Sequence, residues 1–169
     1  MGWRSVDLLV FVPYFALHIV ITLIADIQGV LPAWVLEQHY PQVLRQLVLD
    51  YTEQTQDETL TNPPVWMQSM LWMEVVFQLP FFFVALYALL ARANWIRIPS
   101  IVYSAHVMTT VVPTVANILV QPISLSNKLQ LAPLYLIFFV VPLLLLVRMA
   151  ASPIPYAAAD AGLADKKRR

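Results

Sequence analysis

The chain has 169 residues, of which 60% are hydrophobic and only 12% are charged, and its formal net charge is zero. Soluble domains contain about half apolar residues, so this composition excludes an ordinary soluble domain and indicates a polytopic membrane protein. The few scattered basic residues give no case for nucleic-acid binding, and the absence of cysteine excludes disulfides and thiol chemistry.

Four apolar segments dominate the chain, and each approaches or exceeds the roughly 20 residues that a helix needs to cross the hydrocarbon core. No alternation with a period of two residues competes with this pattern. The predicted fold class is therefore all-α, a polytopic membrane protein with a four-transmembrane-helix bundle. The predicted spans are residues 6–31, 65–91, 98–120 and 131–151. The predicted division is a membrane domain over 1–151 and a tail over 152–169.

The longest connection, residues 32–64, joins the first two spans and is acidic. Within it, the stretch Tyr40–Tyr51 has apolar residues at a spacing typical of a short amphipathic helix lying over the bundle. Basic residues gather at the other ends of the spans. Because positive residues favour the cytosolic side, both termini are predicted to be cytosolic and the acidic connection to lie outside the cytosol. The basic residues behind this prediction are Arg4, Arg92, Arg97, Arg148 and the run 166–169.

Two acidic residues, Asp26 and Glu74, lie inside the apolar spans, where a charged group is costly and usually functional. At about 1.5 Å per helical residue, Asp26 lies roughly 7 Å and Glu74 roughly 13 Å below the same non-cytosolic surface. Consecutive helices usually lie side by side, so both carboxyl groups are predicted to face one cavity. Thr22 and Gln78, each one helical turn away, are polar on the same faces. The residues expected to form the apolar wall of the cavity are Met70, Met73, Phe77, Phe81 and Phe82.

The paired acids admit three interpretations. Two close carboxyl groups in lipid do not easily both ionise, so one is expected to stay protonated and donate to the other. Such a pair can bind the ammonium or hydroxyl end of an apolar ligand, or it can move protons as the acid–base pair of an isomerase. Alternatively, each acid only caps a backbone defect or pairs with a buried polar group.

Further polar residues lie within the spans. His18 lies about two turns from Asp26, and the third span carries Tyr103, His106 and Thr110. For the histidines, a neutral imidazole bonded to a neighbouring carbonyl competes with a role in the site. Threonines in membrane helices are more often bonded to their own backbone. A metal site built from the two acids and a histidine is not favoured, because the oxygen ligands of a hard-cation cage are missing; no metal and no cofactor is predicted.

Three long motifs resemble one known family. They are LHIVITLIADIQGVLP, PPVWMQSMLWMEVVFQLPFF and NWIRIPSIVYSAHVMTTVVP, which cover three of the predicted spans and their flanks. They resemble the sigma-2 receptor (transmembrane protein 97) branch of the EXPERA superfamily, which also contains the emopamil-binding sterol isomerase. The resemblance implies a four-helix protein of the endoplasmic-reticulum membrane, often dimeric, whose cavity opens toward the lipid and binds sterols and cationic amphiphiles.

The resemblance also implies roles for particular residues. Asp26 and Glu74 match the family's pocket acids, and Glu74 is expected to pair with the ligand amine. Asp57 matches an acid of the luminal loop, whose neighbour Leu60 is expected to help cap the cavity. Further pocket-side matches are His18, Gln78, Tyr103 and Thr110. The predicted ligand-binding set is completed by Thr22 and Met70.

The end of the chain both agrees with the family and departs from it. Lys166 and Lys167, fourth and third from the end, match a cytosolic di-lysine retrieval signal. In the fourth span, the stretch Leu131–Leu134 reads Leu-Ala-Pro-Leu where the family has Tyr-Ala-Pro-Tyr, and Tyr135 is displaced by one position. This departure is expected to change ligand selectivity.

Functions of different classes follow from these observations. The favoured one is a receptor-like binder, not an enzyme, that takes sterols, oxysterols or cationic amphiphiles and acts in sterol and lipid homeostasis. The alternative is a sterol or terpenoid double-bond isomerase in which Asp26 and Glu74 transfer protons and Trp72 or Phe77 steadies the cation. A third interpretation is an assembly or chaperone subunit whose acids only secure packing. The implied partners are membrane lipid, a second copy of the chain and a sterol-transport membrane protein.

Overall fold

The structure is a computed structural model that describes residues 3–57, 59 and 61–156. The regular elements within these residues are all helices. Four continuous helical runs among them are long and apolar enough to cross a membrane, which confirms the predicted all-α, four-helix class. The four runs are Trp3–Gly29, Val65–Ala91, Asn94–Val120 and Leu125–Ala150.

A π turn that precedes a proline interrupts each of the first two runs. Pro13 and Pro80 lack a backbone donor and clash with the carbonyl four residues earlier, so an ideal α-helix does not continue through them. The helix widens instead: Val12 N–H donates to Asp7 O, and Leu79 N–H donates to Glu74 O. The first run consists of α1 (Trp3–Val6), η1 (Asp7–Phe11), α2 (Val12–Ile24) and the 3₁₀ turn η2 (Asp26–Gly29). The second consists of α5 (Val65–Met73), the π turn η3 (Glu74–Gln78) and α6 (Leu79–Ala91).

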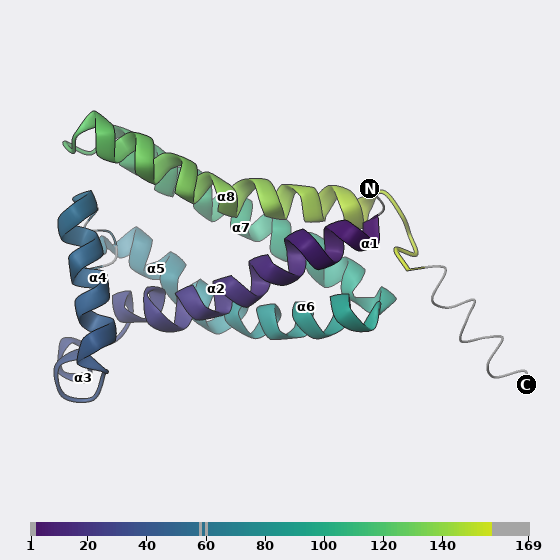
Figure 1. Cartoon of the computed structure of the whole chain (residues 1–169), viewed down its shortest axis with the longest axis horizontal. Helices are drawn as coiled ribbons and strands as arrows, with labels where there is room; N and C mark the ends of the chain where they lie inside the picture. The colour runs from purple at the N-terminus through teal and green to yellow at the C-terminus, as the bar shows by residue number, and fades with distance from the viewer. Residues whose placement is uncertain (1–2, 58, 60, 157–169) are drawn as a thin grey trace, which may run out of the picture.

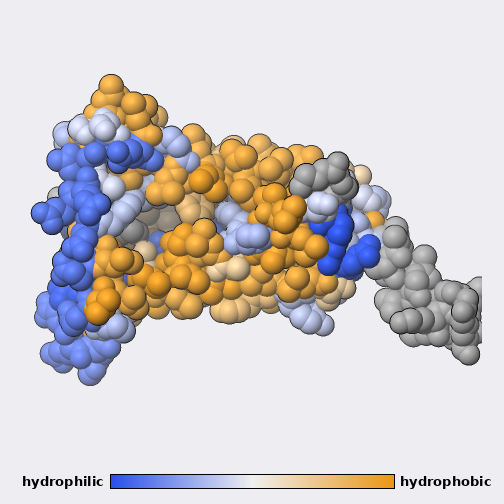
Figure 2. Space-filling view, in the orientation of Figure 1, coloured by the Kyte–Doolittle hydropathy of each residue, from blue (hydrophilic) through white to orange (hydrophobic). Residues whose placement is uncertain are grey.

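The third and fourth runs form a helix pair. The third consists of the 3₁₀ turn η4 (Asn94–Ile96) and α7 (Arg97–Val120), and the fourth is α8 (Leu125–Ala150). α8 begins after Ser124, whose hydroxyl accepts the N–H of Asn127 and so satisfies a free donor of the first turn. α7 packs along α8, and α2 packs along α6 (Figure 1). The side surface of these helices is predominantly apolar, as a membrane-spanning bundle requires (Figure 2).

Two short helices lie at one end of the bundle, which we call the α4 end (Figure 1). They are α3 (Ala33–Gln38) and α4 (Gln42–Thr55). The predicted amphipathic helix is confirmed as α4, in which Val48 is 3% exposed on the inner face and Val43 is 81% exposed. The sequence pattern does not predict α3, since a six-residue helix shows too little periodicity. Tyr40 ties this segment to the first run by donating its hydroxyl to the carbonyls of Leu23 and Ile24.

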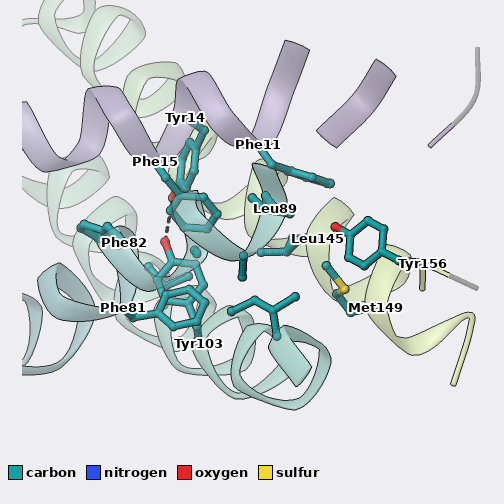
Figure 3. Packing of buried hydrophobic residues seen from close by; sticks show 14 of the residues in the cluster. Phe11, Tyr14, Phe15, Phe81, Phe82, Leu89, Tyr103, Leu145, Met149 and Tyr156 are labelled. Carbon is teal, nitrogen blue, oxygen red and sulfur yellow. Dashed lines mark hydrogen bonds between the residues drawn. The ribbon is translucent and has the colours of Figure 1, made fainter. Parts of the chain in front are cut away.

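A cluster of aromatic and aliphatic side chains forms the core where α2, α6, α7 and α8 meet (Figure 3). The ring centroid of Phe15 lies 5.8 Å from those of Phe81 and Phe82 and 5.5 Å from that of Tyr103. The hydroxyl oxygens of Tyr14 and Tyr103 lie 3.1 Å apart and form a hydrogen bond inside this core. Both buried hydroxyls are therefore satisfied, which is the condition for placing tyrosine in an apolar interior.

Tyr103→Phe is expected to lower the free energy of unfolding by about 1 kcal/mol, because it leaves the buried Tyr14 hydroxyl without its partner. Titration of the detergent-solubilised protein with SDS, followed by circular dichroism, measures this free energy. Tyr87→Phe is the matched control, since Tyr87 is 67% exposed. Equal effects of the two substitutions would contradict a stabilising role for the hydrogen bond.

A buried ion pair joins the first and fourth runs at the opposite end, which we call the terminal end. Asp7 and Arg148 are 1% and 3% exposed, and Asp7 Oδ1 lies 3.5 Å from Arg148 Nε. The ring centroids of Trp3 and Tyr156 lie 5.1 and 5.2 Å from the guanidinium carbon. Arg148 also donates through Nη2 to Pro155 O at 3.1 Å. The residues that follow α8 are thereby held against the start of the first run.

Candidate ligand-binding site

A cavity of about 580 Å³ lies among the helices next to α4. Small-molecule sites typically measure about 300–1,000 Å³, so the cavity is large enough for a drug-sized or lipid-like molecule. A hollow between α2 and α8, beside α4, is visible in Figure 2. Its walls come mainly from α2, α4, α5, α7 and α8. Apolar residues that line it include Met67, Met70, Leu71, Val107, Val111 and Phe138.

Asp26 and Glu74 both line this cavity, and their carboxyl groups are hydrogen-bond neighbours. Each is the first residue of an irregular helical element: Asp26 begins the 3₁₀ turn η2, and Glu74 begins the π turn η3. These two elements pack against each other. Irregular turns inside helices are frequent at functional sites. The two acids therefore share one cavity wall and do not point to separate lipid-facing surfaces.

Glu74 is held by two donors from α2. Its Oε1 accepts hydrogen bonds from Thr22 Oγ1 at 2.9 Å and from His18 Nε2 at 3.1 Å. The two donors are four residues apart, so they lie on one face of the helix. A carboxylate offers about four lone-pair sites, and Glu74 therefore keeps the capacity to accept from Asp26 or from a ligand.

His18 bonds to a carboxyl group, and not to a neighbouring carbonyl as in the simpler of the two interpretations above. Its ring stacks on Phe82 with centroids 4.4 Å apart, and its centroid lies 4.7 Å from that of Phe138. Its Nδ1 is buried and has no hydrogen-bond partner among the described residues. This arrangement fits a neutral imidazole that donates through Nε2 and orients Glu74.

Three other predicted residues occupy different surroundings. Gln78 lines the cavity, is 2% exposed, and keeps an Oε1 with no hydrogen-bond partner among the described residues. Thr110 also lines the cavity, but its hydroxyl donates to Val107 O of its own helix at 2.8 Å. Tyr103 is not a lining residue; it lies in the core beside Tyr14. Gln78 is thus the residue of the three with an acceptor available to a ligand.

The predicted apolar wall is only partly correct. Met70 lines the cavity, but Met73 and Phe77 are 45% and 39% exposed and are not lining residues. Side chains one position apart on a helix are turned by about 100°, so Met73 leaves the face of the neighbouring Glu74, and Phe77 leaves the face of the neighbouring Gln78. Phe81 and Phe82 are buried in the core cluster instead.

A further acid, Asp57, lies in the chain that follows α4 and bonds to a residue that lines the cavity. Asp57 is fully buried, and its Oδ1 accepts from Thr59 N at 3.2 Å and from Thr59 Oγ1 at 2.6 Å. Its Oδ2 accepts the hydroxyl of Tyr135, a lining residue from α8, at 3.0 Å. Burial raises the pKa of Tyr51, which also lines the cavity, to about 12, so its phenol stays protonated at neutral pH.

The family model described as EXPERA (EXPanded EBP superfamily) matches residues 43–149. The chain belongs to the EXPERA family. It is 42% identical over 154 residues to Sigma intracellular receptor 2 of Xenopus tropicalis, which covers 85% of the chain and 88% of that protein. It is 39% identical over 153 residues to Sigma intracellular receptor 2 of Homo sapiens, which covers 83% and 85% respectively. Efficient mitochondria targeting-associated protein 19 of Saccharomyces cerevisiae is 30% identical over 150 residues, which covers 77% of the chain and 89% of that protein.

Family membership and the four apolar helices together make this EXPERA protein a multi-pass membrane protein. The match to the family model begins in α4 and ends in α8. It therefore includes Asp57, Glu74 and Tyr135, whereas Asp26 lies before it.

Several residues that line the cavity of the EXPERA protein were not predicted from its sequence. They are Asp50, Tyr51 and Gln54 of α4 and Tyr135 of α8. The available signal is helical spacing, because Tyr51 lies three residues after the buried Val48 on the same face. Leu60, Lys166 and Lys167 lie outside the described residues. Within the part of the chain that the structure describes, no three His, Asp or Glu side chains are grouped to hold a metal ion.

Proposed function

We propose that this EXPERA protein binds sterols and cationic amphiphiles in the intramembrane cavity and acts as a receptor-like protein in sterol and lipid homeostasis. The observation that carries the proposal is that Asp26 and Glu74 meet in the wall of a mostly apolar cavity. The similarity to proteins named Sigma intracellular receptor 2 supports a receptor-like role.

The site separates apolar and polar contacts. The ligand body would be buried against Met70, Leu71 and Phe138, which supplies most of the binding free energy. An ammonium group would donate to Glu74 in a charge-assisted hydrogen bond, which is roughly twice as strong as a neutral one. His18 and Thr22 hold this carboxyl group in place before the ligand arrives, which reduces the entropy cost of binding.

Asp26→Asn is expected to weaken the binding of tritiated imipramine, a cationic amphiphile, by about tenfold, which is about 1.4 kcal/mol. The neutral amide disturbs the carboxyl pair but leaves Glu74 in place. Equilibrium binding to the protein in lipid nanodiscs measures the dissociation constant, and unlabelled cholesterol should compete. Glu37→Gln, at an exposed position outside the cavity, is the matched control. If the wild-type protein binds neither probe, the proposed function is wrong.

A second candidate function is a sterol or terpenoid double-bond isomerase. The observation that favours it is that two carboxyl groups and a histidine lie together on one cavity wall. A protonated carboxyl group would give its proton to an alkene carbon, and the carbocation would lose a proton from an adjacent carbon to the other carboxylate. The double bond moves, and no oxidant or reductant is needed. The rings expected to steady this cation do not fit, because Trp72 and Phe77 are 49% and 39% exposed and do not line the cavity, whereas Phe138 does.

Incubation of the purified protein with a ring-unsaturated sterol in heavy water separates the two functions. Deuterium on a ring carbon of a product with a shifted double bond would identify an enzyme, and unchanged bound sterol would identify a binder. The third interpretation is tested by the double variant Asp26→Asn with Glu74→Gln. If it loses stability but still binds imipramine with wild-type affinity, the acids only secure packing.

We also propose that the protein resides in the endoplasmic-reticulum membrane with both termini in the cytosol. An even number of spans places both chain ends on one side, and the positive-inside tendency assigns that side to the cytosol. The proposal includes Lys166 and Lys167 as a retrieval signal, a homodimer, and a sterol-transport membrane protein as partner. An engineered glycosylation acceptor in the connection before α4 that stays unmodified would contradict the orientation. Four basic residues of the terminal end support this orientation, namely Arg4, Arg92, Arg97 and Arg148.

A further inference from the structure

The chain that leaves α4 is fastened to α8 by a buried carboxylate. α4 ends at Thr55, and the next residue, Gln56, has a φ of 60° in the left-handed region, which turns the chain. Asp57 follows, fully buried, with one carboxyl oxygen bonded to Thr59 and the other to Tyr135. A buried carboxylate is costly unless donors satisfy it, so these bonds fix where Asp57 can sit.

This fastening closes one end of α4 over the cavity. Figure 1 shows α4 crossing the end of the bundle between α2 and α8. The beginning of α4 is tied to the first run, since Gln28 Nε2 donates to Leu44 O at 3.0 Å. Its end is tied to α8 by Asp57, and nearer the surface by Asn127 Nδ2, which donates to Gln56 Oε1 at 3.1 Å. Between the two ties, the lining residues of α4 are Leu47, Val48, Asp50, Tyr51 and Gln54.

The two ties differ in what they join. The first tie joins the side chain of Gln28 to the backbone carbonyl of Leu44, 16 positions later. The second joins Asp57 to Tyr135, which are 78 positions apart. Breaking the bonds that Asp57 and Gln56 make with α8 would free the end of α4 and leave the bond at its start in place. When this end opens, water can solvate Asp57 and replace the hydrogen bond from Tyr135, so the opening requires no charge to be left unpaired in the bundle.

We propose that Tyr135 is a positioning residue for ligand exchange, and that its hydrogen bond to Asp57 latches the end of α4 shut over the cavity. We call α4 with Gln56 and Asp57 the lid. The inference rests on the proposed binding function and adds the contact that sets the rates of ligand entry and release. The latch residue lies in α8, directly after the stretch Leu131–Leu134. The ring of Tyr135 faces the cavity, so the latch and the ligand space share one side chain.

Tyr135→Phe tests the latch, because it keeps the ring and removes the hydroxyl. We expect the association and dissociation rate constants of tritiated imipramine both to rise about tenfold, and the dissociation constant to change less than about threefold. The exposed Tyr87→Phe is the matched control and should leave both rates unchanged. Unchanged rates in Tyr135→Phe would overturn the latch. A large loss of affinity with an unchanged association rate would also overturn it, since Tyr135 would then be an ordinary ligand contact.

The opposite manipulation locks the lid. The chain contains no cysteine, so Gln56→Cys with Asn127→Cys provides a unique thiol pair at an existing contact. Bridging the pair with a short bis-methanethiosulfonate is expected to slow both rate constants at least about tenfold. A reducing agent should restore the original rates, and each single cysteine variant treated with the reagent should show no slowing. Rates that ignore the bridge would show that ligand does not pass the lid.

A measurement without ligand separates the lid from the binding function. Val48 on the inner face of α4 is 3% exposed, so Val48→Cys reports opening through its rate of labelling by a membrane-impermeant maleimide. Adding Tyr135→Phe should raise this labelling rate about tenfold. If labelling responds but imipramine does not bind, the binding function fails and the lid stands. If imipramine binds but neither labelling nor exchange responds, the lid alone fails.

Discussion

Glu74→Gln is expected to reduce the affinity for imipramine by about 100-fold or more, which corresponds to about 2.7 kcal/mol. The amide oxygen can still accept from Thr22 and His18, so the local packing should survive. What is lost is the negative charge that would pair with the ammonium group in a water-poor cavity. Equilibrium binding of the tritiated amine in nanodiscs measures the change.

Two comparisons make the Glu74 result specific. Glu53→Gln removes a charge from an exposed position of α4 that does not line the cavity, and it should leave the affinity within about twofold. Cholesterol has no charge, so its affinity for Glu74→Gln should change less than about threefold, because an amide still offers both a donor and an acceptor to a hydroxyl group. Equal losses for amine and sterol would show a damaged cavity and would contradict a charge-specific role.

Arg148→Met is expected to lower the free energy of unfolding by about 3–5 kcal/mol, because it leaves the carboxylate of Asp7 buried without its cation. Asp7 is 1% exposed, so water cannot replace the guanidinium without local opening. The substitution also removes the cation that lies between the rings of Trp3 and Tyr156. SDS titration followed by circular dichroism measures the change.

The double variant Asp7→Asn with Arg148→Met separates charge from packing. It removes both charges, and we expect it to recover at least half of the stability lost in Arg148→Met. Arg45→Met, at a half-buried position on α4, is the control for removing a basic residue as such. If the double variant is as unstable as the single one, the loss comes from packing of the arginine stem and not from an unpaired acid.

The fold class could be predicted from the sequence because lipid imposes a simple rule of length and polarity on each helix. The four apolar runs and the spacing around Val48 in α4 were sufficient for this. That the two intramembrane acids share a cavity also follows from their depth and from the antiparallel order of the first two runs. Partners distant in the sequence could not be predicted: nothing in the local pattern links Asp57 to Tyr135 or Asp7 to Arg148.

The cavity wall was harder to predict than the acids, for a geometric reason. An apolar residue in a membrane helix is suited equally to lipid, to the core and to a cavity, so composition does not distinguish Met70 from Met73. Polar residues carry more information, because lipid penalises them on the outside. The contribution of α4 depends on how a helix outside the membrane rests on the bundle, which periodicity alone does not specify.

The π turn at Glu74–Gln78 means that the second run holds one residue more than an ideal helix of the same length would. If the same residues instead formed a continuous α-helix, with none removed, each would turn the chain by about 100° and the extra residue would add one such step. The part before the turn would then rotate by about 100° relative to the part after it. Glu74 would leave the cavity while the aromatic residues of α6 kept their places in the core. The wide turn before Pro80 therefore sets the direction in which Glu74 points, and it does so through the backbone and not through the identity of any side chain.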